Sequence, residues 1–162
     1  MPVKTQPFSP SVAPGRSLVA FGGALYYKFG NQLWRSDGTA ANTLPLATVG
    51  IISPNHVQSF DGIVPAGDLL YFVGNSSEAG QELWRSDGTP EGTFLVKDLN
   101  DGASGAWPNR LTNVNGTLYF TASAAAGVGE SVWRTGGTPE STVLVHSLPG
   151  AGLPNPAGRP FK

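Results

Sequence analysis

Short runs of alternating apolar and polar residues fill most of the chain, and Gly, Pro and Asn separate them. In the last third, these runs predict four strands, over Arg110–Val114, Thr117–Ala122, Ser131–Thr135 and Thr142–Leu148. An Asn-Gly pair between the first two predicts a type I′ hairpin turn, because both central residues of that turn need positive φ. No window keeps the i, i+3, i+4 spacing of an amphipathic helix over three turns. The pattern therefore predicts an all-β protein.

The same four-strand pattern occurs three times along the chain. The heptapeptide LWRSDGT stands at Leu33–Thr39 and again at Leu83–Thr89, and the variant VWRTGGT stands at Val132–Thr138. A period of about 50 residues is typical of architectures that repeat one supersecondary unit. Each unit is predicted to begin with an apolar strand, at Ser17–Phe21, His56–Phe60 and Arg110–Val114.

The repeats define a central β domain, residues 17–150, between two extensions. The repeat boundaries fall near residues 17–50, 51–101 and 102–150. Residues 1–16 are a Pro-rich N-terminal extension that lacks the apolar segment of a secretory signal. Residues 151–162 form a C-terminal extension with a Pro-Asn pair like those before the second and third repeats. This extension is therefore predicted to start a truncated fourth repeat.

The heptapeptide predicts a strand end followed by a tight corner. Alternation places Leu33 and Arg35 on one face of the strand and Trp34 on the other. Asp37 can accept backbone N–H bonds within the turn, and Gly38 tolerates positive φ. The third copy lacks the carboxylate but keeps two glycines, which favours a structural role over catalysis. The residues assigned to this structural motif are Trp34, Asp37, Gly38, Thr39, Trp84, Asp87, Gly88, Thr89, Trp133, Gly137 and Thr138.

The second repeat resembles the ELWxxDGT repeat, which runs in tandem arrays in bacterial proteins, many of them exported or surface-associated. The match consists of Gln81–Thr89, then Gly92-Thr93 and Val96–Leu99, and the third repeat departs from it at Val132 and Gly136. A fainter likeness links the corners to the Asp-box hairpins of sialidase-type propellers. The resemblance implies β-propeller-like blades and an extracellular, cell-surface or periplasmic location, and it implies no shared activity.

Two architectures fit three four-stranded repeats. We expect three four-stranded antiparallel propeller-type blades, and a β-trefoil is the alternative. Closed propellers typically have four or more blades, so three blades leave an open arc that must meet a second copy or another protein. A dimer would give a ring of six blades, and the heterologous contacts of such a ring can close.

Composition and charge exclude several classes of function. The formal net charge is −1, without the basic stripe of a nucleic-acid-binding protein. No apolar stretch is long enough to span a bilayer, so we do not expect an integral membrane protein. The chain has no cysteine, which excludes thiolate chemistry. It also has no P-loop, no G-x-S-x-G and no H-E-x-x-H motif, and we expect no enzymatic activity.

The acidic residues suggest no convincing catalytic or metal site. Glu82 and Glu130 precede their tryptophans at different offsets, so we expect two solvated strand residues and not a glycosidase pair. Asp37 and Asp87 are too sparse for a calcium loop, which needs several oxygen ligands in succession. No cofactor is therefore expected. Calcium is the alternative cofactor, with Asp98 and Asp101 as the additional ligands.

We expect a non-enzymatic structural or interaction protein that assembles with itself, preferably as a dimer, or joins a larger complex as an accessory subunit. A carbohydrate-binding, lectin-like module is the alternative, since its sugar sites combine an aromatic platform with charged side chains. Trp107 lies outside the repeat pattern and is the first candidate for a ligand or partner contact. The other candidates are the arginines that follow the repeated tryptophans, Arg35, Arg85 and Arg134.

Overall fold

The computed structural model describes residues 18–29, 32–47, 50–51, 62–123 and 130–147. These residues form strands, turns and loops, and none of them lies in a helix. The all-β prediction is therefore confirmed for the part of the chain that the structure describes. The predicted strand at residues 56–60 and the two extensions lie outside it.

The first and third sheets are four-stranded antiparallel meanders. The first sheet has the order β1 (Val19–Phe21), β2 (Ala24–Phe29), β3 (Gln32–Ser36) and β4 (Leu44–Ala47). The third sheet has the order β10 (Asn109–Val114), β11 (Thr117–Ala122), β12 (Ser131–Thr135) and β13 (Val143–Ser147). The bounds of the third sheet reproduce the predicted strands to within a residue at each end.

The middle sheet is also four strands wide, although five strands contribute to it. Its order is β5 (Gly50–Ile51), β7 (Leu69–Ser76), β8 (Gly80–Ser86) and β9 (Phe94–Leu95), and β6 (Val64–Ala66) also pairs with β7. β5 pairs with one end of β7 and β6 with the other, so together they cover one edge of that strand.

Tight turns join the first two strands of the outer sheets, as the sequence predicts. The β10–β11 turn has φ of 50° at Asn115 and 86° at Gly116. The β1–β2 turn has φ of 53° at Gly22 and 74° at Gly23. Both central residues are therefore in the positive-φ region that a type I′ turn requires.

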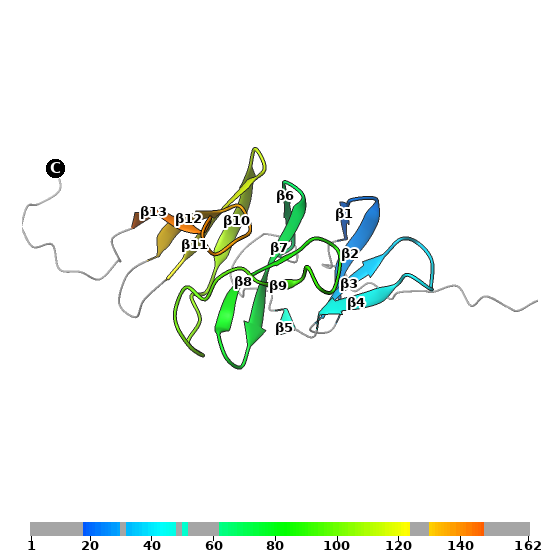
Figure 1. Ribbon diagram of the computed structural model, residues 1–162, viewed down its shortest axis with the longest axis horizontal. Helices are drawn as coiled ribbons and strands as arrows, with labels where there is room; N and C mark the ends of the chain where they lie inside the picture. Colours follow the sequence, from blue (N-terminus) through cyan, green and yellow to red (C-terminus); the bar gives the residue numbers. More distant parts are fainter. Residues whose placement is uncertain (1–17, 30–31, 48–49, 52–61, 124–129, 148–162) are drawn as a thin grey trace, which may run out of the picture.

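Figure 1 shows the three sheets side by side in a row along the long axis, with the middle sheet between the other two. Each junction between sheets has its own apolar core. Buried residues of the first core are Ala24, Tyr26, Leu33 and Leu46 from the first sheet and Ile63, Leu70 and Phe72 from the second repeat. Buried residues of the second core are Ala66, Tyr71, Leu83, Val96, Ala106, Leu118, Phe120 and Ala122. The row does not close on itself, so it has two end sheets.

The strand register shows which residues are equivalent in the three sheets. On the second and third strands of each sheet, a tyrosine lies opposite an arginine: Tyr26 and Arg35, Tyr71 and Arg85, Tyr119 and Arg134. One residue further along, an aromatic residue lies opposite a tryptophan: Tyr27 and Trp34, Phe72 and Trp84, Phe120 and Trp133. Because neighbouring residues of a strand point to opposite faces, these two sets mark the two faces of every sheet.

Candidate functional site

The loop between the third and fourth strands of each repeat is held by side-chain hydroxyls. We call these loops the corners, residues 36–43, 86–93 and 135–142. In the second corner, Ser86 Oγ accepts the N–H of Gly88 at 3.0 Å and lies 2.7 Å from Thr93 Oγ1. Thr93 Oγ1 donates its single proton to the carbonyl of Thr89 at 2.6 Å. Ser86 must therefore donate to Thr93, and both hydroxyls are satisfied.

The same hydroxyl relay occurs in the other two corners. The paired oxygens lie 2.7 Å apart between Ser36 and Thr43, and 2.8 Å apart between Thr135 and Thr142. Ser36, Ser86 and Thr135 were not identified as motif residues from the sequence. The available signal was that all three copies place a hydroxyl residue directly after the arginine.

The aspartate of the first two corners closes a small turn. Asp37 Oδ1 accepts the backbone N–H of Thr39 at 2.9 Å and its hydroxyl at 2.7 Å, and Asp87 makes the same two bonds to Thr89. The hydrogen bond from the threonine hydroxyl has the largest effect and lowers the pKa of both carboxyl groups. The hydrogen bond from the threonine backbone N–H lowers it further. Both carboxylates are occupied within their own loop.

In the third corner a serine takes the place of the missing aspartate. Ser141 Oγ accepts the backbone N–H of Gly136 at 3.1 Å and that of Thr138 at 3.0 Å. The two glycines of this copy are therefore assisted by a side-chain acceptor. A hydroxyl from the far side of the loop supplies the acceptor that the carboxylate supplies in the other two.

In the second and third corners, a glycine lies where the loop meets the preceding sheet. Gly38, Gly88 and Gly137 have φ of 94°, 95° and 98°. A Cβ on Gly88 would lie 2.3 Å from the hydroxyl of Tyr26, and a Cβ on Gly137 would lie 2.4 Å from Leu69 Cδ1. The second and third corners therefore pack closely on the sheet before them. A Cβ on Gly38 would meet no atom within 4 Å.

In the first and middle sheets, the face that carries the tyrosine packs against the next sheet along the chain. We call it the tyrosine face. Its equivalent residues are Tyr26, Leu33 and Leu46 in the first sheet, Tyr71, Leu83 and Val96 in the middle, and Tyr119, Val132 and Val145 in the third. The first two sets are buried in the two cores between sheets. In the third sheet, Tyr119 and Val132 are half-buried and Val145 is 49% exposed.

The opposite face carries the tryptophan, and we call it the tryptophan face. Leu70 and Phe72 of the middle sheet and Leu118 and Phe120 of the third are buried against the preceding sheet. Their equivalents in the first sheet, Leu25 and Tyr27, are only half-buried. The row therefore ends on a tryptophan face at the first sheet and on a tyrosine face at the third.

The three repeated tryptophans are half-buried packing residues. Trp34 stacks on Tyr27, with ring centroids 6.4 Å apart and planes at 21°. Trp84 packs against the first core and Trp133 against the second. The indole N–H groups of all three are buried, and none has a hydrogen-bond partner in the structure.

The structure separates the predicted tryptophan–arginine pairs. Trp84 contributes to the core between the first and middle sheets, whereas a guanidinium nitrogen of Arg85 lies beside Gly137 of the third. The Arg85 guanidinium also lies over the ring of Phe94, 4.2 Å from its centroid, in a cation–π contact. Adjacent strand residues face opposite ways, so a repeated tryptophan and its arginine do not line one sugar site. Arg35 is half-buried and Arg134 is exposed.

Glu82 is buried, so the prediction of a solvated residue is wrong for it. Its Oε1 accepts the N–H of Ala106 at 2.8 Å and of Asn100 at 3.3 Å, which ties the loop after β9 to β8. Its Oε2 is buried without a partner. Burial raises the pKa of Glu82 to about 7, and the nearby charge of Asp98 acts in the same direction, against the three backbone N–H groups that lower it.

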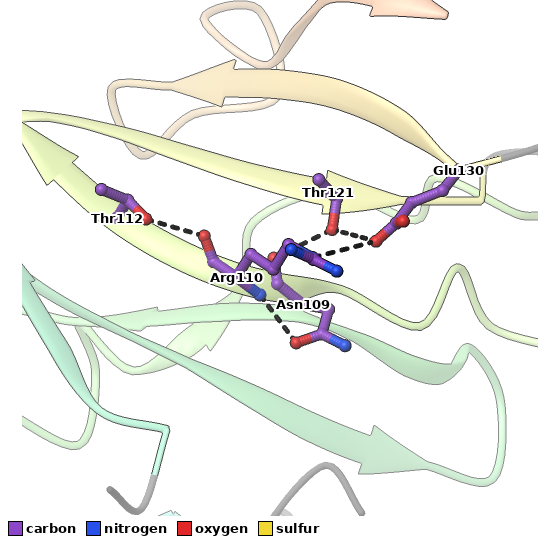
Figure 2. A network of polar contacts seen from close by, with 5 residues as sticks. All are labelled: Asn109, Arg110, Thr112, Thr121 and Glu130. Carbon is purple, nitrogen blue, oxygen red and sulfur yellow. Dashed lines mark hydrogen bonds and ion pairs between the residues drawn. The ribbon is translucent and has the colours of Figure 1, made fainter. Parts of the chain in front are cut away.

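Glu130 is exposed, as predicted, and belongs to a surface network around a β-bulge (Figure 2). Its Oε1 accepts a hydrogen bond from the Thr121 hydroxyl and lies 3.8 Å from Arg110 Nε. Arg110 has φ of 52°, and its backbone N–H donates a hydrogen bond to Asn109 Oδ1 at 2.8 Å. An exposed ion pair of this kind contributes little to stability. Glu130 and Glu82 therefore lie in different environments, one exposed and one buried.

Trp107, the first candidate for a ligand or partner contact, is 60% exposed. Its indole N–H donates to the carbonyl of Ser104 at 3.0 Å, and its backbone N–H donates to Gln81 at 3.1 Å. The backbone has φ of 56°, which is uncommon outside glycine. The side chain is thus held outward from the loop that joins the middle and third sheets.

Among the described residues, no three His, Cys, Asp or Glu side chains converge to hold a metal ion. No helix suited to crossing a bilayer is found in the same residues. Asp98 Oδ2 accepts the N–H of Gly102 at 3.4 Å, while Asp101 is exposed.

Comparison of the chain with protein-family models, with curated proteins and with solved structures gives no match.

Proposed function

We propose that the protein is a non-enzymatic interaction scaffold, built from three propeller-type blades of the ELWxxDGT kind, that assembles with copies of itself or joins a larger complex. The observation that carries this proposal is the open row of sheets. Two junctions bury a tyrosine face against a tryptophan face, while the same two faces remain accessible at the ends. Sheets stacked in a row also support blades over a β-trefoil.

The chemistry of the conspicuous polar groups supports a structural role. The corner aspartates bind their own loops, and the hydroxyls beside them satisfy one another. Glu82 binds two backbone N–H groups of a neighbouring loop. Each of these groups holds a backbone segment in place, so the repeated motif is explained without a substrate.

The solution mass tests this proposal. Light scattering on a size-exclusion column should give a mass above the 16.8 kDa of one chain, and a closed six-blade ring requires twice that mass. The mass should fall on dilution, because association depends on protein concentration. A constant monomer would contradict self-assembly and would leave the accessory-subunit form of the proposal, in which another protein covers the end sheets.

Carbohydrate binding is the second candidate, and Trp107 is the described residue that favours it. An exposed indole held by a hydrogen bond provides a flat apolar surface of the kind that contacts partners and ligands. A glycan array with the intact protein and with Trp107→Ala tests this candidate. A glycan signal that disappears in the variant would support a lectin-like module, and no signal above background would remove it.

A further inference from the structure

We propose that the first corner, residues 36–43, docks on the tyrosine face of the third sheet of a second copy of the chain, in a head-to-tail contact. This inference rests on the proposed scaffold function and names its partner and the two surfaces involved. The chain itself contains this type of contact twice, so the inference extends an interface that the structure already shows.

Each internal junction brings together the same two surfaces. A corner glycine of one sheet meets the tyrosine of the sheet before it: Gly88 lies against Tyr26, and Gly137 lies against Tyr71 and the neighbouring Leu69. A tryptophan face covers the rest of the tyrosine face. The junction is therefore directional, because one sheet contributes its corner and the other its tyrosine.

Burial shows what each junction covers. Tyr26, Leu33 and Leu46 are 3%, 0% and 4% exposed under the middle sheet. Their equivalents Tyr71, Leu83 and Val96 are each 1% exposed under the third sheet. The equivalent residues of the third sheet are not covered by another sheet: Tyr119 and Val132 are half-buried, and Val145 is 49% exposed. The third sheet thus presents an acceptor surface with the same residue types in the same register.

The first sheet presents the complementary surface. Its corner has the same φ at Gly38 as the two docked corners have at theirs, and the space around that glycine is open. Its tryptophan face, with Leu25, Tyr27 and Trp34, is half-buried. One copy therefore carries one corner that contacts no tyrosine face and one tyrosine face that no corner covers. The corner of one copy can dock on the tyrosine face of the other.

Charge supports the same pairing. Arg85 borders the docked third corner, since its guanidinium would lie 3.1 Å from a Cβ on Gly137. Arg134 is the equivalent residue on the open acceptor and is exposed. The first corner carries the exposed carboxylate of Asp37, which is negatively charged at neutral pH like any aspartate that is not buried. A negative corner would thus meet a positive acceptor, which favours association of the right partners.

Two variants interrupt the proposed contact from opposite sides. Gly38→Asn places a side chain at the point of closest approach, and asparagine is among the residues that best tolerate positive φ. Gly102→Asn is its matched control, because Gly102 has φ of 87°, also faces open space, and belongs to the loop between β9 and β10, outside the first corner and the third sheet. Arg134→Glu places a negative charge on the exposed acceptor, opposite the Asp37 corner. Thermal unfolding of each variant checks that its fold is intact.

The contact predicts a specific mixing result in analytical ultracentrifugation. Gly38→Asn and Arg134→Glu should each weaken self-association by about tenfold or more, the loss expected at a central contact, while Gly102→Asn associates like the wild type. An equimolar mixture of the two impaired variants should form a one-to-one complex, because it contains one intact corner and one intact acceptor.

The possible failures separate this inference from the proposed function. If the wild type associates and Gly38→Asn associates equally well, the docking surface is wrong and self-assembly stands. If both variants are monomeric and their mixture stays monomeric, an intact corner does not dock on an intact third sheet, and the head-to-tail contact is wrong. If the wild type itself is a monomer at every concentration, both this inference and self-assembly are overturned.

Discussion

At the scale of single residues, the corner is specified by hydroxyl groups as much as by the aspartate and glycine that make the motif conspicuous. The Ser86 hydroxyl accepts a hydrogen bond from the backbone N–H of Gly88 and donates one to the Thr93 hydroxyl. The Thr93 hydroxyl in turn donates to the backbone carbonyl of Thr89, so these bonds hold both ends of the corner together. Ser86 is fully buried, whereas Ser36 has the same role in a half-buried position. The two serines therefore form a natural pair for measuring what burial adds.

Ser86→Ala should lower the free energy of unfolding by about 1–3 kcal/mol, because it removes the acceptor of the Gly88 N–H and the hydroxyl that donates to Thr93 Oγ1. Ser36→Ala should cost less, since water can replace the lost hydroxyl. Denaturant titration of both variants gives the comparison. Equal losses would show that the corner hydroxyls stabilise the fold independently of burial.

At the scale of elements, the loop between β9 and β10 is fixed to β8 by Glu82 and by two close backbone contacts. A Cβ on Gly105 would lie 2.3 Å from the backbone nitrogen of Gln81, and a Cβ on Gly80 would lie 2.5 Å from the carbonyl oxygen of Ala103. Backbone atoms cannot move aside as flexible side chains do. Only glycine fits at these positions while the loop stays in contact with the strand.

Gly105→Ala should therefore destabilise the protein by clearly more than the roughly 1 kcal/mol that positive φ alone costs. Gly102→Ala is the matched control, because Gly102 has φ of 87°, shares the loop and faces open space. Thermal unfolding of the two variants isolates the steric contribution. A control that is as unstable as Gly105→Ala would show that the backbone conformation, and not the close approach, limits this loop.

Glu82 predicts a specific pH dependence for the same loop. Its folded-state pKa of about 7 lies above its ordinary value of 4.5, so the folded state binds the proton more tightly than the unfolded state. The contribution of this proton to the free energy of unfolding is fully present below pH 4.5 and is lost as the pH rises through 7. The free energy of unfolding should fall over this range by at most about 3 kcal/mol.

Glu82→Gln should flatten this dependence between pH 5 and pH 8, because the amide stays neutral and its oxygen can still accept the two backbone N–H bonds. Gln32 stands at the equivalent position of the first repeat, where it is half-buried. Glu91→Gln, on the exposed second corner, controls for the change in net charge. Thermal unfolding across this pH range should give the wild-type slope for the control. A wild-type slope for Glu82→Gln would assign the pH dependence to other groups.

The elements were predictable where the signal is local. Alternation and the Asn-Gly turn determine β10–β13, and the repeated Asp-Gly pair predicts the corners. The sequence analysis failed where the neighbour comes from another part of the chain. The burial of Glu82 depends on a loop about 20 residues further on. The replacement of the lost aspartate by Ser141 is local, but it depends on how the corner closes. The alternation of the strand already places Trp34 and Arg35 on opposite faces of the sheet. This placement counts against a sugar site shared by the two side chains, although that alternative was proposed without it.

At the scale of the whole molecule, three equivalent glycines measure how firmly the sheets are joined. Gly38, Gly88 and Gly137 have φ within a few degrees of one another, so alanine should impose a similar backbone cost at each. Their surroundings differ, because only Gly88 and Gly137 lie against a preceding sheet. Gly88→Ala and Gly137→Ala should therefore lower the free energy of unfolding more than Gly38→Ala, by the 1–3 kcal/mol typical of overpacking a well-packed contact.

Denaturant unfolding at low protein concentration tests this difference in the single chain, since dilution removes any contribution from association. If the sheets unfold as one unit, all three variants should keep the wild-type dependence on denaturant and shift only the midpoint. A separate early transition in Gly137→Ala would instead show that the third sheet detaches on its own. Three equal midpoints would mean that the corners contribute nothing to the junctions, and the head-to-tail docking of a second copy would then lose its structural precedent.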